Sequence, residues 1–555
     1  MSEVITEMLV PGVYIEVRAE GLLSVGAIST GNVGLIGTAE KGTGQVQRIN
    51  SVEDARAKFG EDTWDPSAKD DNLTLVKAIK LLFDNGANTV YAKRVVDEAK
   101  AKAATYQLKG QNGTPLLTLR ARTSGTWANR LEVRVEIADS QILVTDELVT
   151  PQNGSYVLSA SDLAKPEPPG TTVGKVLVRD QGRVNRYQLK TDAASATSVQ
   201  VNAADRRLSF QAQPSGTAEV YADYWVPGPG LRKITLRYGN MQEVYFVPSV
   251  AYLAQRLQAE DSPSKLVEVV QVNQNGLPEA TERFEAFTAG ENGPVELGHF
   301  QNALDELVEQ DVQIVVVAGQ PFTKVQGAVL GHLEKTENLG RERIAVVGAD
   351  RSDVDTILNN ANGVADKRLI LVAPGLRQQD PESEQMVNLP PAFAAAAVAG
   401  KLSSLSPHIS LTNKTLSGID GLTMEYSYGD LKALLQNRVL VLQRKRGVRV
   451  VKGISTDDEA FKQISVRRIV DYVKQGTRIG ANQYIGKLNN KRVRENLRTT
   501  LDGFLSDLII REFLTGYKLK VFADRAMEIR GEVLVTMDLN PTFSIDVIRV
   551  IMNLS

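Results

Sequence analysis

The run Val312-Gln313-Ile314-Val315-Val316-Val317 is an almost continuous stretch of β-branched apolar residues. Runs of this kind and length are typical of strands that are buried on both faces of a parallel sheet. Similar runs follow at residues 344–347 and 369–372, and segments with helical periodicity at residues 325–339 and 354–358 separate the three strands. This alternation predicts a doubly wound α/β domain with helices on both faces of its sheet.

The same pattern opens the chain and is then interrupted. Residues 73–83 carry apolar side chains at three- and four-residue spacing, and an apolar strand follows at residues 89–96. From residue 104 to residue 247 short alternating stretches separated by Asn-Gly and Pro-Gly turns replace the helices. The run at residues 266–270 is assigned to the resumed parallel sheet. The sequence therefore predicts one α/β domain with a β-rich insertion.

An α+β domain is predicted after a segment rich in alanine, serine, proline and glycine at residues 390–430. Two short strands come first, at residues 438–442 and 448–451. Two amphipathic helices then carry apolar stripes, and two further strands, 518–522 and 531–537, close the domain. The stripes consist of Val466, Ile469, Val470 and Val473 in the first helix, and Val493, Leu497, Leu501, Phe504 and Leu508 in the second.

Both ends of the chain carry apolar, strand-forming runs, at residues 10–17 and 541–552. Chain ends are usually polar and mobile unless something holds them, so these runs need partner strands. The nearest available partners are neighbouring copies of the same chain. The predicted interface residues are Val13, Tyr14, Ile15 and Val17 in the first run, and Phe543, Ile545, Val547 and Val550 in the second.

The chain of 555 residues is too long for one ordinary core, and the patterns predict a multidomain α/β and α+β organisation with a strand arm at each end. The predicted parts are an N-terminal arm (1–25), the first part of the α/β domain (26–103), the β-rich insertion domain (104–247), the second part of the α/β domain (248–400), the α+β C-terminal domain (401–537) and a C-terminal arm (538–555).

The net charge of −2 hides a basic region. Residues 431–530 hold about 22 Lys and Arg against about 10 Asp and Glu. Either nucleic acid or an acidic protein could use this charge, but the basic residues are interleaved with helical apolar stripes and lack aromatic stacking platforms, which favours a protein surface. The candidate contacts are Arg444, Lys445, Arg446 and Arg449 in a tight turn, and Arg467 and Arg468 on the helix that follows.

Catalytic, cofactor-binding and metal sites are not predicted. The chain has no cysteine and three scattered histidines, which disfavours thiolate chemistry and histidine metal clusters. The stretch from Gly170 to Val176 resembles a Walker loop, but it is one residue short and has valine where a hydroxyl should hold magnesium. Neither a membrane span nor a secretory signal is visible. An α/β hydrolase-like enzyme and a β-rich adhesin or capsid-like binding module remain alternatives.

Five short motifs in this order resemble the tail sheath protein family of contractile phage tails and related contractile injection systems. They are Pro11-Gly12-Val13-Tyr14-Ile15-Glu16, Ser124-Gly125-Thr126-Trp127-Ala128-Asn129, Arg446-Gly447-Val448-Arg449-Val450, Val466-Arg467-Arg468-Ile469 and Phe543-Ser544-Ile545-Asp546.

The resemblance implies a subtilisin-like α/β domain without catalytic residues, a β-rich outer insertion, and a C-terminal domain that faces an inner tube. It implies a structural, non-enzymatic subunit without cofactors, which assembles in the bacterial cytoplasm as part of a virion tail or an injection particle. Its implied partners are other copies of itself in a helical sheath, the inner tube protein, and baseplate and tail-terminator proteins. Small-molecule substrates, direct nucleic-acid contacts and a membrane span are not implied.

Overall fold

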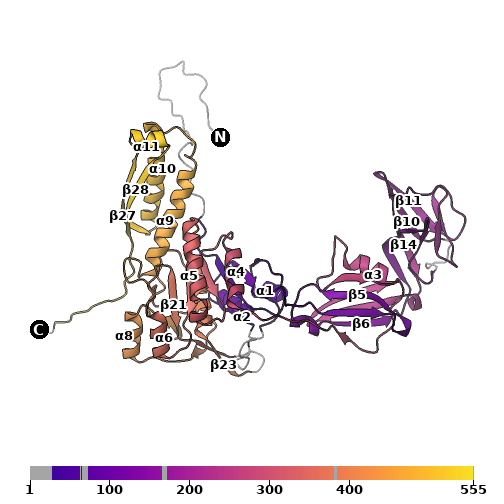
Figure 1. Ribbon diagram of the computed structural model, residues 1–555, viewed down its shortest axis with the longest axis horizontal. Coiled ribbons are helices and arrows are strands. Elements are labelled where there is room, and N and C mark those ends of the chain that lie inside the picture. Colours follow the sequence, from indigo (N-terminus) through magenta and orange to yellow (C-terminus); the bar gives the residue numbers. More distant parts are fainter. Residues whose placement is uncertain (1–27, 63, 65–72, 165–171, 380–383, 554–555) are drawn as a thin grey trace, which may run out of the picture. The chain divides into compact units, whose positions relative to one another are not determined.

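The computed structural model describes residues 28–62, 64, 73–164, 172–379 and 384–553. The predicted N-terminal strand with Val13, Tyr14, Ile15 and Val17 therefore lies outside the described residues. The chain forms two compact units, drawn in Figure 1. The core unit contains Gly44–Val95, Val295–Ser555 and the chain up to Ala39, and the insertion unit contains Glu40–Thr43 and Val96–Pro294.

The core unit is built on an eight-stranded sheet with the order β2-β3-β1-β19-β20-β21-β25-β26. The six inner strands run parallel, while β2 and β26 pair antiparallel at the two edges. The strands are β1 (Val33–Gly37), β2 (Gln47–Ile49), β3 (Val90–Arg94), β19 (Ile314–Val317), β20 (Ile344–Gly348), β21 (Leu369–Ala373), β25 (Leu440–Arg444) and β26 (Val448–Val450).

Helices cover both faces of this sheet because successive side chains of each buried strand point to opposite faces. Val316 packs into the hydrophobic cluster on one face, whereas Val315 and Val317 pack into the cluster on the other. The first face is covered by α1 (Val52–Phe59), α2 (Leu75–Asp84) and α7 (Pro391–Ser403), and the second by α4 (Leu297–Leu307), α5 (Phe322–Asn338), α6 (Val354–Ala361) and α8 (Tyr428–Gln436). The doubly wound sheet is as predicted, and the subtilisin-like label stays a prediction.

The predicted boundary at residue 401 is wrong, because β25 pairs parallel to β21 and extends the central sheet. The small residues that suggested a linker form the buried helix α7. Small side chains allow this helix to pack closely: a Cβ on Gly400 would lie 2.4 Å from the carbonyl oxygen of Leu82 in α2. A small antiparallel sheet follows beside it, with the strands β22 (Leu376–Gln379), β23 (Met386–Leu389) and β24 (Gly421–Leu422).

The insertion unit is β-rich, as predicted, but it is longer than residues 104–247. The strand β17 (Val267–Val272) was assigned to the parallel sheet, and this is wrong: it pairs antiparallel to β5 within the insertion unit. Only Val267 of β17 is fully buried, so its apolar run covers one end of an antiparallel sheet. An apolar run by itself does not distinguish these two environments.

One hydrophobic cluster joins the sheets of the insertion unit with helix α3 (Val250–Leu257). The eight-stranded sheet contains β7 (Ile142–Leu148), β14 (Glu219–Val226), β10 (Thr172–Asp180), β11 (Arg183–Lys190), β12 (Ser198–Val201), β13 (Arg207–Ser209), β9 (Ser155–Val157) and β8 (Pro151–Gln152). The two smaller sheets contain β16 (Met241–Val247), β15 (Arg232–Tyr238), β6 (Glu132–Ile137) and β18 (Glu285–Ala286), and β17, β5 (Pro115–Ala121) and β4 (Thr105–Lys109).

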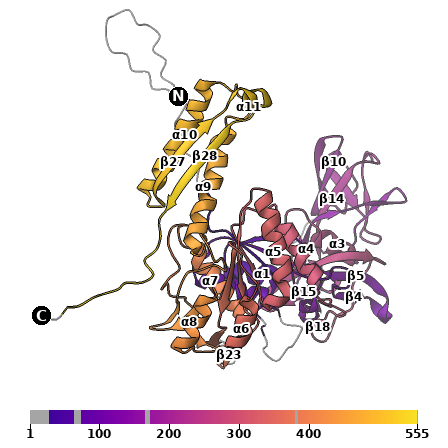
Figure 2. The same ribbon diagram turned by 60° about the vertical axis from the view of Figure 1, so that its left-hand side comes forward.

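The remaining elements form a C-terminal layer on the core unit. It consists of α9 (Ile464–Asn482), α10 (Lys491–Ile510), β27 (Leu514–Phe522), α11 (Arg525–Arg530) and β28 (Leu534–Pro541). Figure 2 shows the β27–β28 pair lying over α9 and α10. The predicted stripe of α10 is confirmed, since Leu497, Leu501, Phe504 and Leu508 are all buried.

The C-terminal arm begins later than predicted. Residues 538–541 belong to β28, which pairs antiparallel with β27 of the same chain, so that Lys518 lies opposite Asp538. The arm is therefore the chain from Thr542 onward. Figure 1 shows this segment leaving the body of the core unit.

Candidate functional site

Helix α9 is attached to the eight-stranded sheet of the core unit and its helix α5 by a network of charged side chains. At its centre, the guanidinium of Arg368 forms hydrogen bonds to both carboxylate oxygens of Glu337 (3.0 Å each) and of Asp471 (2.7 and 3.0 Å). The side chain of Arg368 is 2% exposed. Glu337 belongs to α5, Arg368 immediately precedes β21, and Asp471 belongs to α9, so the network joins three elements that are distant in sequence.

The network shifts the pKa values of its members. The hydrogen bonds from Arg368 hold the pKa of the Glu337 carboxyl well below its usual range. Burial opposes the charge on Arg368, but the hydrogen bonds to Asp471 and Glu337 outweigh that effect and raise the pKa of Arg368. Both groups are therefore charged at neutral pH, and α9 is held by fixed ion pairs.

The structure corrects two of the six predicted inner-tube contacts. Arg467 is buried and donates a hydrogen bond to Asp471 (2.7 Å), one turn further along α9. Arg468 is also buried and donates to the carbonyl oxygens of Thr30 (3.1 Å) and Leu405 (2.9 Å). These side chains point into the core unit, so they are not surface contacts. Helix α9 is covered on more than the one face that its apolar stripe predicts.

Burial lowers the pKa of Arg468 to about 10. Among the residues that the structure describes, Arg468 forms no ion pair, and its charge is met by backbone carbonyl oxygens alone. Two further basic residues of α9 also turn inward: Lys474 lies 3.4 Å from both Glu337 and Glu342, and Arg478 donates to Glu342 (2.7 Å). Some of the basic residues that were predicted to form a surface are thus neutralised by ion pairs within the fold.

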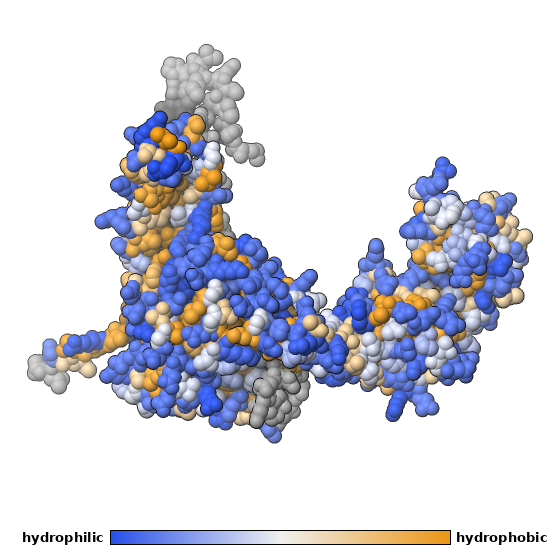
Figure 3. All heavy atoms as spheres, in the orientation of Figure 1, coloured by the Kyte–Doolittle hydropathy of each residue, from blue (hydrophilic) through white to orange (hydrophobic). Residues whose placement is uncertain are grey.

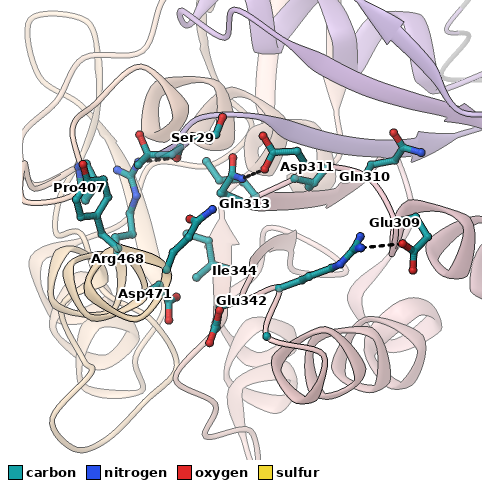
Figure 4. Close-up of a pocket in the computed structure, with 17 residues that line it drawn as sticks. Ser29, Glu309, Gln310, Asp311, Gln313, Glu342, Ile344, Pro407, Arg468 and Asp471 are labelled. Atoms are coloured by element: carbon teal, nitrogen blue, oxygen red, sulfur yellow. Dashed lines mark hydrogen bonds and ion pairs between the residues drawn. The ribbon is translucent and has the colours of Figure 1, made fainter. Parts of the chain in front are cut away.

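A cleft of about 320 Å³ lies beside Arg468, and Figure 4 shows its lining residues. Ser29 and Thr30 come from the segment that precedes β1, Asp311 from the connection between α4 and β19, and Asp471 from α9. Its polar groups are largely engaged with one another: Gln313 donates to Asp311 (2.7 Å), for example. We therefore regard the cleft as the place where the N-terminal segment joins the core unit.

The other predicted tube contacts lie in the turn between β25 and β26. Arg444, Lys445 and Arg446 are exposed, while Arg449 is half-buried and donates to the side chain of Asn413 (3.1 Å). None of the first three forms an ion pair with the residues that the structure describes. The turn brings three unneutralised cations together at one exposed point.

The C-terminal arm is held at Ser544 and Asp546 and is exposed beyond them. Asp546 accepts hydrogen bonds from Thr412 Oγ1 (3.1 Å) and Gln463 Nε2 (3.3 Å), and its Oδ2 lies 3.2 Å from Lys452 Nζ. Ser544 donates its backbone N–H to Gln463 Oε1 (3.3 Å). Sequence reasoning missed this contact, although the polar Ser544 and Asp546 inside an apolar run were the available signal.

Beyond Asp546 the arm presents large apolar side chains to solvent. Val547 is 82% exposed and Val550 is 71% exposed, and the arm pairs with no strand in the described part of the chain. The predicted interface residues Phe543 and Ile545 are exposed as well. Figure 3 shows apolar residues interspersed with polar ones along the arm, and further apolar side chains over the C-terminal layer.

The β27–β28 pair has two unpaired edges, because no third strand joins this sheet among the described residues. Tyr517, Leu519, Met537 and Leu539 pack inward against the helices, while the alternate residues face away. Two-stranded sheets are only marginally stable without such support. The layer is thus a supported hairpin with open edges.

The described residues contain no group of three or more His, Cys, Asp or Glu side chains that could hold a metal ion. Within the same residues, no helix has the length and apolar character needed to cross a membrane.

Two family models match the chain. The phage tail sheath protein central domain matches residues 293–456, and the phage tail sheath C-terminal domain matches residues 456–555. Among curated proteins, the tail sheath protein of Mycobacterium phage Bxz1 is 29% identical over 211 residues, a match that covers 35% of this chain and 36% of that protein. The matched region thus spans about a third of the length of this curated relative.

Two solved structures share the fold over nearly the whole chain. A sheath tail protein of Desulfitobacterium hafniense superposes with a TM-score of 0.57 at 14% identity, covering 96% of this chain and 100% of that chain. A sheath tail protein of Listeria innocua gives a TM-score of 0.59 at 14% identity, covering 95% of each chain. The fold is thus a mixed α/β multidomain fold of the sheath tail type.

The resemblance to the tail sheath protein family of contractile phage tails and related contractile injection systems is confirmed by these matches. Residues 293–555 match the models of the central and C-terminal domains of phage tail sheath proteins, and most of the insertion unit lies outside both matched regions.

Proposed function

We propose that this chain is the structural subunit of a contractile tail sheath. Copies assemble as a helical tube around an inner tube by exchanging strands, and the tube contracts to drive the inner tube through a target envelope. The observation that best supports this proposal is that one chain presents both an exposed apolar arm and a hairpin with unpaired edges. An extended segment adds to an open sheet edge by β-augmentation, in which backbone hydrogen bonds supply affinity and side-chain pockets supply specificity.

The dimensions of arm and hairpin agree. The arm beyond Asp546 has six described apolar or basic residues before Asn553, and at about 3.3 Å per residue these span about 20 Å as a strand. The hairpin strands β27 and β28 contain nine and eight residues. A donated arm therefore fits along most of either edge.

The acceptor of the arm belongs to another copy. Figures 1 and 2 both show the arm running away from the hairpin of its own chain. An exchange in which each copy gives its arm to a different surface of the next copy is heterologous, and heterologous contacts that do not close into a ring generate helical assemblies. The N-terminal run at residues 10–17 is a second candidate donor for the other edge of the hairpin.

The arm is tested by replacing Val547 and Val550 with Lys in the full chain. Each substitution places a charge where an apolar side chain would be buried against the neighbour, so we expect loss of long tubes in electron micrographs of the purified protein. The matched control replaces the exposed valines Val184 and Val244 of the insertion unit with Lys, which should leave assembly intact. Long tubes formed by a chain that lacks residues 547–555 would refute the strand exchange.

The exposed turn is proposed as the contact with an acidic inner tube. Replacing Arg444, Lys445 and Arg446 with Glu reverses three unpaired charges at one point, and it should abolish tube-templated assembly while self-assembly continues. The control is the same reversal at Lys487, between α9 and α10, and at Lys491 and Arg492 in the first turn of α10. Templated assembly that is indifferent to reversal at residues 444–446 would remove this surface from the proposal.

The particle is proposed to be a virion tail or an injection particle assembled in the bacterial cytoplasm, with baseplate and tail-terminator proteins at its ends. The chain is proposed to have no catalytic role. The polar lining of the Arg468 cleft supports this, because its groups are engaged in holding elements of the fold together.

A further inference from the structure

We infer that the start of helix α9 is a shared anchor for the roots of both terminal arms, which are residues 28–32 at one end and Ser544 to Asp546 at the other. This inference rests on the proposed function, because it concerns the arms that the proposal assigns to strand exchange. The roots are kept fixed on the core unit by four positioning residues, Asp546, Gln463, Lys452 and Arg468.

The C-terminal root is held by four polar contacts. Gln463 is the residue that precedes the first turn of α9, and its side chain bonds both Asp546 and the backbone N–H of Ser544. Thr412 and Lys452 complete the shell around the Asp546 carboxylate, whose side chain is only 13% exposed. A carboxylate near the N-terminal end of a helix is also favoured by the helix dipole. Asp546 is thus a localised, charge-assisted attachment inside an otherwise apolar arm.

The N-terminal root is held from the same helix. Arg468 donates to the carbonyl oxygen of Thr30, and Ile28 packs against the apolar cluster that contains Ile469 and Tyr472 of α9. Asn32 secures the next residues by donating to the carbonyl oxygen of Asp311 (2.8 Å). Arg468 is a buried cation that donates its hydrogen bonds to backbone carbonyl oxygens. Moving those carbonyls away would leave the buried charge without partners, which is unfavourable in free energy.

The two roots are therefore connected through the same pair of elements, helix α9 and the segment from Leu405 to Thr412. Gln463 and Arg468 are five positions apart, which is about 7.5 Å along a helix. On the opposite side, Arg468 donates to Leu405 and Ser406, while Thr412 of the same segment donates to Asp546. The two arms are thus connected mechanically through about one and a half turns of α9 and one short segment.

The consequence is a fixed spacing between the two roots in every copy. If the arms join neighbouring copies, this spacing sets how neighbours are placed while their domains rotate. The polar residues of Phe543-Ser544-Ile545-Asp546 and the arginine of Val466-Arg467-Arg468-Ile469 then have a definite role, which is to attach the arms to the core unit.

The test uses the absence of native cysteine. In full-length protein, Asp546→Ala removes the C-terminal attachment, and Thr412→Cys with Asp546→Cys removes it until a short bismaleimide cross-linker restores it covalently. We expect Asp546→Ala to speed hydrogen exchange of the Ser544 amide about tenfold. In electron micrographs the same variant should lose tubes of uniform helical repeat, and cross-linking of the double-cysteine chain should restore both properties. The matched control, Asp355→Ala, removes an exposed charge from helix α6, away from the arms and the hairpin, and should change neither.

Two results would overturn the inference. If the cross-linked chain cannot form tubes of wild-type repeat, the root must release during assembly. If Asp546→Ala leaves both the Ser544 exchange and the tubes unchanged, Asp546 is no anchor. These outcomes are separate from failure of the proposed function: when a chain that lacks residues 547–555 still forms tubes, strand exchange fails, and the hydrogen-exchange measurement on the monomer still decides the anchor.

The N-terminal root is measured in the same way. Arg468→Lys keeps the charge but loses the fork of donors that reaches several carbonyls at once. Exchange at residues 28–32 should rise about tenfold. Arg498→Lys on the exposed side of α10 is the control. Unchanged exchange at residues 28–32 in a folded Arg468→Lys chain would overturn the N-terminal half of the inference.

Discussion

Replacing Arg368 with methionine should destabilise the core unit strongly. Methionine preserves much of the volume of the side chain but removes four charge-assisted hydrogen bonds to Glu337 and Asp471, and a fifth to the carbonyl oxygen of Arg343 (3.1 Å). The two carboxylates then lose their common partner while staying largely buried, at 25% and 17% exposure.

The magnitude follows from what remains around the carboxylates. Removing one partner of a buried ion pair typically costs 3–5 kcal/mol of the free energy of unfolding, because a buried charge is left uncompensated. Here Glu337 keeps Lys367 at 3.2 Å, and Asp471 keeps Arg467 at 2.7 Å. The expected loss is therefore near the lower limit, at about 3 kcal/mol.

The assay is urea unfolding followed by tryptophan fluorescence. The chain has three tryptophans, of which Trp127 and Trp225 lie in the insertion unit and Trp64 lies in the core unit, in edge-to-face contact with Phe393. In a background with Phe at positions 127 and 225, the signal reports the core unit alone.

The control is Lys335→Met, also in α5, which removes an exposed ion pair with Asp305 of α4 and should cost less than about 1 kcal/mol. Adding Glu337→Gln to the Arg368 variant should recover about 1–2 kcal/mol, since one of the stranded charges is removed. A loss below about 1 kcal/mol for Arg368→Met, equal to that of the control, would refute the view that this network holds α9.

Two further outcomes are expected. Burial and the neighbouring Arg343 lower the pKa of His332 to about 4, and Arg343 Nη1 lies 3.0 Å from His332 Nε2. In the unfolded chain His332 has its ordinary pKa of about 6.5, so the unfolded chain takes up the proton first as the pH falls, and the free energy of unfolding should drop by about 2 kcal/mol between pH 7 and pH 5. The variant His332→Gln should make the free energy of unfolding, measured with urea, less dependent on pH. An unchanged slope would contradict this. A Cβ on Gly476 would lie 2.1 Å from the ring of Phe504. The variant Gly476→Leu should therefore push α9 away from α10 and lower the thermal unfolding midpoint by several degrees. The control Gly503→Leu, on the open side of α10, should leave the midpoint unchanged.

Local features of the fold follow from the sequence with little ambiguity. Ser51 begins α1 and accepts the Asp54 backbone N–H at 3.1 Å, as its residue type and position predict. The stripe of α10 and the buried strand β19 are set by the spacing of apolar residues. These features depend on groups within a few residues of one another, and periodicity reports them directly.

Sequence reasoning failed where burial comes from two directions. The apolar stripe of α9 identifies one covered face, and a basic pair beside it is ordinarily solvated. Here the central domain covers that second face, and carbonyl groups and Asp471 meet the charges of Arg467 and Arg468. For β17 the error was similar, since the run of apolar residues indicates a strand but does not indicate which sheet it joins.

By itself the sequence determined the α/β alternation, the β-rich insertion, the helix stripes and the apolar runs at both ends, because each is written in the spacing of neighbouring side chains. The tertiary structure alone decided which charged side chains form ion pairs or hydrogen bonds inside the fold and where the C-terminal arm attaches. Arg368 meets Asp471 across 103 positions, and Arg468 meets Thr30 across 438. Such contacts depend on how distant segments are brought together and on the direction of each side chain, and neither quantity is encoded in local periodicity.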